Sequence, residues 1–198
     1  MPVGAADLPT CRVAGCGAIV PGMNDQSFTF RSIGAIRTPF HDCVGMPVQG
    51  LVARTEGAVE LLPELEAGLT DIEGFSHLIL LYCFNRTAAE VPFLQSPLLQ
   101  RPLLEETEHG VFAIRSPVRP NPIGLTVVEL LSREGRTLRV RGVDMLDGTP
   151  LLDIKPYVAR FDAPGECRCG WLEPHLDRVA EARADDRFND RFRGGKRN

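Results

Sequence analysis

Short stretches in which apolar and polar positions alternate recur along this chain, separated by glycine and proline. The clearest is 125–144, where the runs LTVVELL and TLRVRGV flank a polar turn that contains Gly135. Two alternating runs around such a turn are typical of a β-hairpin. In the second run the leucine and valines are expected to point inward, and Arg139 and Arg141 outward. Gly142 interrupts the alternation and predicts a bulge.

Shorter runs predict further strands, over 28–37, 58–62, 111–115 and 151–158. The run 75–84 (FSHLILLYCF) is apolar at almost every position, which fits a strand buried on both faces or a core helix, and periodicity alone does not decide between them. A brief helix is expected to begin at Pro63, and the only long helical pattern covers 174–188. Consecutive short strands without β–α alternation indicate a mainly all-β protein, an antiparallel barrel or sandwich, with a short C-terminal helix.

Composition agrees with one globular domain. The chain has 198 residues, of which 43% are hydrophobic and 24% charged. The net charge of −4 argues against wholesale electrostatic binding of nucleic acid and leaves room for a local basic patch. Mean hydropathy is −0.06, and no apolar run approaches the roughly 18 residues of a membrane span, so no membrane association is expected.

The ends of the chain differ from its middle. Residues 1–26 are rich in Gly, Ala and Pro, show no period and do not resemble a secretory signal, so we expect a flexible N-terminal arm. The barrel domain is expected over 27–162, followed by a C-terminal extension, 163–198, with a helix and a basic tail. With no export signal, the six cysteines are expected to be free thiols in the cytoplasm.

Familiar catalytic and metal-binding motifs are missing. No GxGxxG follows a strand, and no P-loop, G-x-S-x-G or HExxH occurs. Cys167, Cys169 and His175 could supply part of a zinc site, but the paired CxxC spacing of structural zinc is absent, and we predict no metal.

The segment 115–124 (RSPVRPNPIG) is the most unusual in the chain. Each residue before a proline is pushed toward an extended conformation, which holds Arg119 and Asn121 on a stiff loop between two strands. Arg115 and Arg119 present permanent cations suited to carboxylates or phosphates. The alternative is a rigid barrel corner with solvated arginines.

A second polar segment is 144–157 (DMLDGTPLLDIKPY), where Asp144 and Asp147 flank a tight turn. Carboxylates at strand ends can hold ribose hydroxyls or an ammonium group, or act as a base. The alternative is an Asp-Gly turn with local side-chain caps. Polar residues also end the apolar run, with Asn85 and Arg86 facing either a pocket or simply solvent.

Four segments together resemble the TsaA-like family, whose characterised members include the TrmO-type tRNA methyltransferases. They are IGAIRTPF at 33–40, GFSH at 74–77, GVFAIRSPVRPNPIGLT at 110–126 and DMLDGTPLLDIKPY at 144–157, within a resemblance that covers about 28–160. The resemblance implies a single antiparallel β-barrel that binds S-adenosylmethionine, usually as a homodimer. It also implies methylation of N6 of threonylcarbamoyladenosine at position 37 of tRNA.

The resemblance also implies which residues contact the cofactor: Pro47, Val48, Gln49, Asn85, Arg86, Arg115, Leu125, Asp144, Met145, Leu146 and Asp147. Two positions depart from the family pattern. Val48 stands where the family has arginine, and Asn85 stands where it usually has histidine, a loss for which Arg86 can compensate. TrmO proteins commonly carry a second, tRNA-holding domain, whereas only 163–198 follows the barrel here.

The catalytic candidates are Arg115, Arg119 and Asn121. The carbamoylated N6 is a weak nucleophile that must lose its proton, so a cation that stabilises the resulting anion is needed. Arg115 or Arg119 would supply it, while Asn121 orients the substrate. One alternative is a methyltransferase that acts on another nucleoside or small acceptor, and another is a non-catalytic S-adenosylmethionine-binding module.

Overall fold

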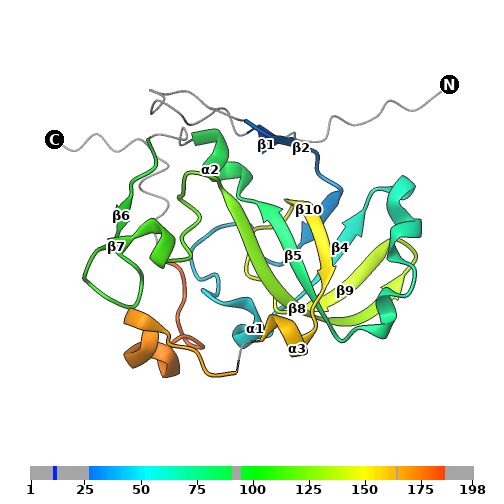
Figure 1. Cartoon of the computed structure of the whole chain (residues 1–198). Helices are drawn as coiled ribbons and strands as arrows, with labels where there is room; N and C mark the ends of the chain where they lie inside the picture. The colour runs from blue at the N-terminus through cyan, green and yellow to red at the C-terminus, as the bar shows by residue number, and fades with distance from the viewer. Residues whose placement is uncertain (1–10, 13–26, 91–94, 164, 186–198) are drawn as a thin grey trace, which may run out of the picture.

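The computed structural model describes residues 11–12, 27–90, 95–163 and 165–185, and its main feature is a closed β-barrel (Figure 1). Six strands form it: β3 (Gly34–Arg37), β4 (Glu56–Leu61), β5 (His77–Cys83), β8 (Ile123–Glu134), β9 (Thr137–Arg141) and β10 (Thr149–Pro156). Around the barrel they follow the order β10-β3-β4-β9-β8-β5, with every neighbouring pair antiparallel. The predicted mainly-β fold with a single antiparallel barrel is confirmed.

The hairpin predicted over 125–144 is present as β8 and β9. Gly135 in its turn has φ +57°, a left-handed conformation that glycine adopts without steric cost. Gly142 directly follows β9, and the N–H groups of Gly142 and Val143 both donate to the Thr55 carbonyl, at 2.8 and 3.2 Å, which is the two-to-one pairing of the predicted bulge. A second irregularity lies on β8, where the register shifts between Leu130 and Ser132.

Side chains on alternating positions of the strands form the core. On β5, Leu78 and Leu80 are fully buried while Ile79 and Leu81 are half-buried, so the strand buries one face completely and not both. That rules out the core helix and corrects the expectation of two buried faces. The inward positions predicted on the second hairpin strand are buried, as are those facing them: Ile36, Val59, Val128, Leu138, Val140, Val143 and Leu151. Burying one such side chain contributes about 1.5–3 kcal/mol.

Short helices and two small strand pairs surround the barrel. The helices are α1 (Gly50–Ala53), η1 (Pro63–Leu69), η2 (Ile72–Gly74), α2 (Asn85–Glu90), η4 (Val111–Ala113), α3 (Ala159–Asp162) and η5 (Gly170–Arg178), those marked η being 3₁₀-helices. The strand pairs are β1 (Cys11–Arg12) with β2 (Thr29–Phe30), and β6 (Leu99–Gln100) with β7 (His109–Gly110). The helix expected at Pro63 is η1, which begins there.

Three sequence-based boundaries need correction. The strand expected over 28–37 is split into β2 and β3, because the Ser32 hydroxyl donates to the Gly34 and Leu151 carbonyls and bends the chain between them. The strand expected over 111–115 is wrong, since the 3₁₀-helix η4 begins there. The long helix expected over 174–188 is also wrong: η5 contains Pro174, which has no N–H to donate, and residues 186–188 lie outside the described part.

Cys83, at the end of β5, is fully buried and disulfide-bonded, so the expectation of free thiols is wrong there. Compartment and composition do not reveal which thiols lie next to each other. Cys43, Cys167 and Cys169 form no disulfide. The expected N-terminal arm lies outside the described residues, apart from β1.

Candidate functional site

A cavity of about 850 Å³ lies beside the barrel and collects most of the residues singled out from the sequence. Its wall comes from the loop before α1, the end of β5, the proline-rich loop, the start of β8 and the turn before β10. The sequence-predicted residues that line it are Pro47, Val48, Gln49, Asn85, Arg86, Arg115, Arg119, Leu125, Asp144, Met145 and Leu146. Segments distant in sequence therefore meet in one site.

Asp144 is the polar centre of this wall. The Thr126 hydroxyl donates to its carboxylate at 2.9 Å from Oδ1 and 3.0 Å from Oδ2, and the Gly50 N–H donates to Oδ2 at 2.9 Å. Burial raises the pKa of Asp144 above its ordinary value, while these hydrogen bonds and the charge of Arg115 act in the opposite direction. The cavity thus contains a buried hydrogen-bond acceptor, the Asp144 carboxylate, which Gly50 and Thr126 hold in place.

Gly50, the first residue of α1, lies against the end of β9. A Cβ at this position would overlap the Gly142 carbonyl, so only glycine lets the Gly50 N–H approach the Asp144 carboxylate so closely. The backbone of the 47–49 loop is therefore held beside the 144–146 turn.

Tyr82 on β5 is a lining residue that the sequence analysis did not select. Its side chain is only 3% exposed and lies beside Thr126 and Asp144. Burial and the Asp144 carboxylate raise the pKa of the phenol, which therefore stays protonated and able to donate. A tyrosine within an otherwise apolar run was the available signal, because a buried hydroxyl needs a polar partner.

The two arginines of the proline-rich loop both reach the cavity. Arg115 Nη1 donates to Gln49 Oε1 at 3.0 Å, and Arg119 Nη1 donates to the Ile114 carbonyl at 3.4 Å. The proline-rich loop is also held by Gln100, whose Nε2 donates to the Val118 carbonyl at 2.6 Å. Hydrogen bonds to the side chain and to the backbone of the loop therefore hold both guanidinium groups in place beside the cavity.

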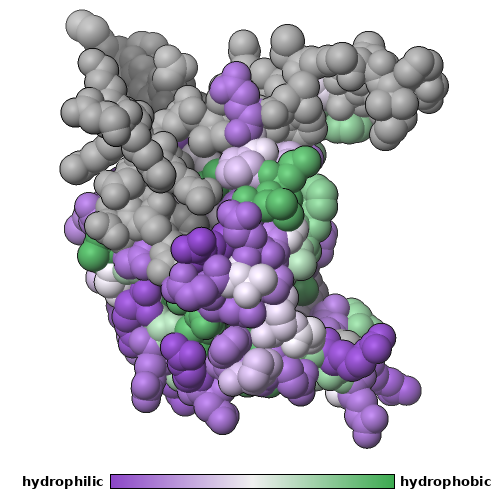
Figure 2. Space-filling view, turned by 90° about the vertical axis from the view of Figure 1, so that its left-hand side faces the viewer, coloured by the Kyte–Doolittle hydropathy of each residue, from purple (hydrophilic) through white to green (hydrophobic). Residues whose placement is uncertain are grey.

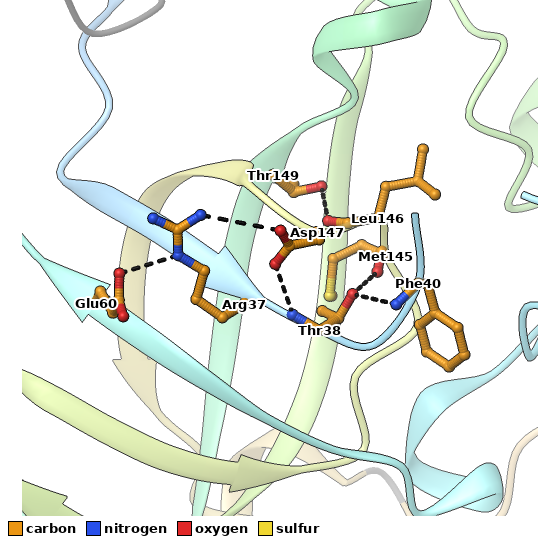
Figure 3. A network of polar contacts seen from close by, with 8 residues as sticks. All are labelled: Arg37, Thr38, Phe40, Glu60, Met145, Leu146, Asp147 and Thr149. Atoms are coloured by element: carbon orange, nitrogen blue, oxygen red, sulfur yellow. Dashed lines mark hydrogen bonds and ion pairs between the residues drawn. The ribbon is translucent and has the colours of Figure 1, made fainter. Parts of the chain in front are cut away.

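The structure does not bring Asp147 or Asn121 into the cavity wall. Asp147 Oδ1 accepts a 3.1 Å hydrogen bond from the Thr38 N–H, and Oδ2 lies 4.0 Å from Arg37 Nη1 (Figure 3). The Thr38 hydroxyl in turn donates to the Met145 carbonyl at 2.9 Å, so this network fixes the turn that carries the lining residues. Asn121 is exposed, and its carbonyl accepts the N–H of Ile123, a lining residue, at 2.7 Å.

The charge of the described wall is predominantly positive. Its basic side chains are those of Arg86, Arg101, Arg115 and Arg119, and its acidic side chains are those of Asp42 and Asp144. Arg101 also pairs with Glu106 at 3.1 Å, outside the wall. Despite the negative net charge of the chain, this surface suits a phosphate-bearing ligand.

The C-terminal segment 165–185 also lines the cavity, as do residues 101–104, and no role in the site was predicted for either segment. The lining residues of the C-terminal segment are Cys169, Trp171, Leu172, Val179 and Ala184. Beyond η5 the chain pairs with the loop before α1: the Gly45 N–H donates to the Ala184 carbonyl, and the Ala184 N–H to the Met46 carbonyl, both at 2.8 Å. η5 lies beside the barrel, at the lower left of Figure 1. Figure 2 shows that side, where hydrophobic patches are small and set among hydrophilic residues.

Cys167 and Cys169 precede η5, and Glu173 lies within it. Glu173 accepts the Cys169 N–H at 2.9 Å. The pKa of the Cys169 thiol is raised by burial and by Glu173. Among the described residues no group of three or more histidine, cysteine, aspartate or glutamate side chains is arranged to hold a metal ion, and no helix is long and apolar enough to cross a membrane.

Comparison with known proteins gives a consistent assignment. The model of the tRNA-methyltransferase O N-terminal domain matches residues 35–163. A Pyrococcus abyssi protein named "Probable S-adenosyl-L-methionine-binding protein" is 50% identical over 160 residues, covering 80% of this chain and 84% of that protein. The Mus musculus tRNA (adenine(37)-N6)-methyltransferase is 35% identical over 184 residues, covering 89% of this chain and 41% of that enzyme.

Solved structures agree with the sequence relatives. The crystal structure of TrmO from Pseudomonas aeruginosa superposes with a TM-score of 0.59 at 37% identity, covering 74% of this chain and 63% of that one. The chain thus spans less than two thirds of this enzyme and of the mouse enzyme. The matched region contains the barrel except for Gly34, the first residue of β3, and the chain belongs to the tRNA-methyltransferase O family.

Proposed function

We propose that the protein transfers a methyl group from S-adenosylmethionine to N6 of adenosine 37 in tRNA, with the threonylcarbamoylated base as the acceptor. The mouse relative is named for methylation of adenine 37 at N6. The observation that carries the proposal is the buried Asp144 carboxylate in a cavity whose other ionised lining side chains are mostly arginines.

The residues of the cavity fit S-adenosylmethionine, which when bound supplies an electrophilic methyl group. A volume of about 850 Å³ is within the range of about 300–1,000 Å³ for small-molecule sites. Asp144 accepts hydrogen bonds from Gly50, Thr126 and Tyr82, and a carboxylate has about four acceptor positions, so it can also bind a ligand ammonium or hydroxyl group. Leu125 and Met145 offer apolar surface for the uncharged part.

Arg115 and Arg119 are the residues that we assign to the acceptor. The lone pair of the carbamoylated N6 is delocalised, so the nitrogen must first give up its proton, to the solvent; transfer of the methyl group would then leave S-adenosylhomocysteine. A guanidinium near the developing anion stabilises it most when water is excluded and the donor is already in place. Transfer further requires the methyl carbon in line with N6 at about 3–3.5 Å, which a rigid loop favours. Asn121 would orient the RNA from outside the cavity wall.

We further propose that the protein acts in the cytoplasm as a homodimer. Near β6 and η4, three apolar side chains are more than half exposed: Leu98 at 64%, Leu99 at 61% and Phe112 at 80%. A second copy would bury them. Sedimentation equilibrium should give twice the chain mass, and Phe112→Asp should give the single mass.

The test of the activity is methyl transfer from radiolabelled S-adenosylmethionine to two tRNA pools. One pool comes from cells that lack the endogenous N6 methylation at position 37, and the other from cells that retain it. We expect label only in the first pool, mapped to the nucleoside at position 37. Arg139→Ala is the matched control, because Arg139 is an exposed arginine on β9 outside the cavity wall.

Label in neither pool, with cofactor binding confirmed by calorimetry, would contradict the proposed acceptor. Transfer to another nucleoside or a small molecule would then be the function. No transfer to any acceptor would favour a binding module, as the name of the P. abyssi relative indicates for that protein.

A further inference from the structure

The Trp171 side chain is held by two contacts with the segment 109–113. Its indole Nε1–H donates to the Ala113 carbonyl at 2.8 Å. The ring stacks on the His109 imidazole, with centroids 4.8 Å apart and planes 18° from parallel. His109 Nε2 is in turn 2.9 Å from Glu105 Oε2. Such fixation lowers the entropic cost of using the ring as a binding surface.

Trp171 lines the cavity, whereas His109 is not among the lining residues. The imidazole occupies one face of the indole, so a ligand in the cavity can stack only on the other face. On that wall it is accompanied by Ala113 and Arg115, so a planar aromatic surface and a guanidinium lie along the same stretch. A base stacked on an aromatic ring, with its phosphates near arginine, is a general mode of nucleic-acid binding.

The residues that we assign to the cofactor lie on other parts of the wall, so the wall beside Trp171 can bind the methyl acceptor. The loop and turn residues around Gln49, Asp144 and Met145, which provide the polar acceptor and apolar surface for S-adenosylmethionine, all come from the barrel and its loops. Trp171 comes from η5, beyond the region 35–163 that the family model matches.

We propose that Trp171 is the stacking surface for the purine of the methyl acceptor, so that the C-terminal segment contributes to the choice of nucleotide. This inference rests on the proposed function. A flipped-out base would then stack on the indole, with Arg115 in the same wall of the cavity. A stacking contact of this kind changes affinity by about 5- to 150-fold.

The chain has a single tryptophan, so its intrinsic fluorescence reports on this position alone. We would saturate the wild-type protein with S-adenosylhomocysteine and titrate an anticodon stem-loop RNA with adenine at position 37, or the same RNA with an abasic site there. We expect the adenine RNA to quench the emission well beyond the abasic RNA. Equal quenching by both RNAs, or complete quenching by S-adenosylhomocysteine alone, would overturn the inference.

Kinetics provide a second, independent measurement. Trp171→Leu keeps an apolar side chain without the ring and should raise the KM for tRNA by about 5- to 150-fold, with cofactor affinity unchanged. Trp171→Phe should restore most of the loss. A purely structural role would instead weaken cofactor binding in both variants, and that result would contradict us.

The two proposals fail separately. Methyl transfer to tRNA without base-dependent quenching overturns the stacking role alone. Base-dependent quenching without transfer overturns the activity and leaves the stacking role.

Discussion

Asp144 is buried among donors on three sides, and its titration should be visible in the stability of the whole protein. Burial raises its native pKa above the ordinary 3.8, so the folded state keeps this proton to a higher pH than the unfolded chain. The contribution of this group to the free energy of unfolding therefore falls as the pH rises from about 4 through the raised value. Because Asp144→Asn removes the titration, the variant should gain stability relative to wild type as the pH rises.

Urea unfolding between about pH 4 and pH 7 measures that difference. Asp153→Asn is the control, since Asp153 is a partly exposed carboxylate outside the cavity wall, 2.7 Å from Lys155. If the free energies of unfolding of wild type and Asp144→Asn change in parallel over this pH range, the pKa of Asp144 is not raised in the folded protein.

Arg119 offers a sharper test of the chemistry than Arg115, because Arg115 also holds Gln49 and lies near Asp144. We expect Arg119→Ala to lower kcat by about 10²–10³-fold, the usual effect of removing one donor from a developing anion. Calorimetry should show little change in S-adenosylmethionine affinity. Wild-type turnover in this variant would remove Arg119 from the mechanism.

At the scale of elements, the paired strands β5 and β8 contribute Tyr82, Gly124 and Leu125 to the cavity wall. Tyr82 and Gly124 are cross-strand partners, and a Cβ at position 124 would overlap the tyrosine ring. Gly124→Ala should therefore displace Tyr82 and destabilise the protein by about 1–3 kcal/mol. Cofactor affinity should fall as well, because Tyr82 lies beside Asp144.

Thermal unfolding and calorimetry check both effects. Gly68→Ala in η1 is the matched control, since a Cβ there meets no atom within 4 Å. Equal stability of the two variants would mean that β5 and β8 tolerate a wider separation than the structure shows.

The elements also show where sequence reasoning succeeds. The β8–β9 hairpin was predicted because its alternation and its turn glycine are local signals. The segment 174–188 shows helical spacing, yet the chain beyond η5 pairs with a loop more than a hundred residues earlier, which no local pattern encodes. The same contrast between local patterns and long-range contacts holds for the site. Motif residues identified its barrel side, whereas Trp171 belongs to the wall only through tertiary contacts.

For the molecule as a whole, stability should be unevenly distributed between the barrel and the segment that covers the cavity. The barrel is closed and has no free sheet edge, whereas 165–185 joins the loop before α1 through few backbone hydrogen bonds. We expect the amides of Gly45 and Ala184 to exchange faster than those of β5 and β8, and to slow together when cofactor is added. Hydrogen exchange followed by NMR or mass spectrometry measures this. Protection of Ala184 equal to that of β5 would show that segment and barrel open as one unit.

The pairing of Met46 with Ala184 also has a consequence for biosynthesis. The chain leaves the ribosome N-terminal end first, at about 5–20 residues per second, so the loop before α1 emerges roughly ten seconds before its partner. All six barrel strands precede that partner, and the barrel can close while one wall of the cavity is still missing. A nascent molecule therefore acquires its barrel before it acquires a complete site, so the small ligand meets the full cavity wall only after residues 165–185 have emerged.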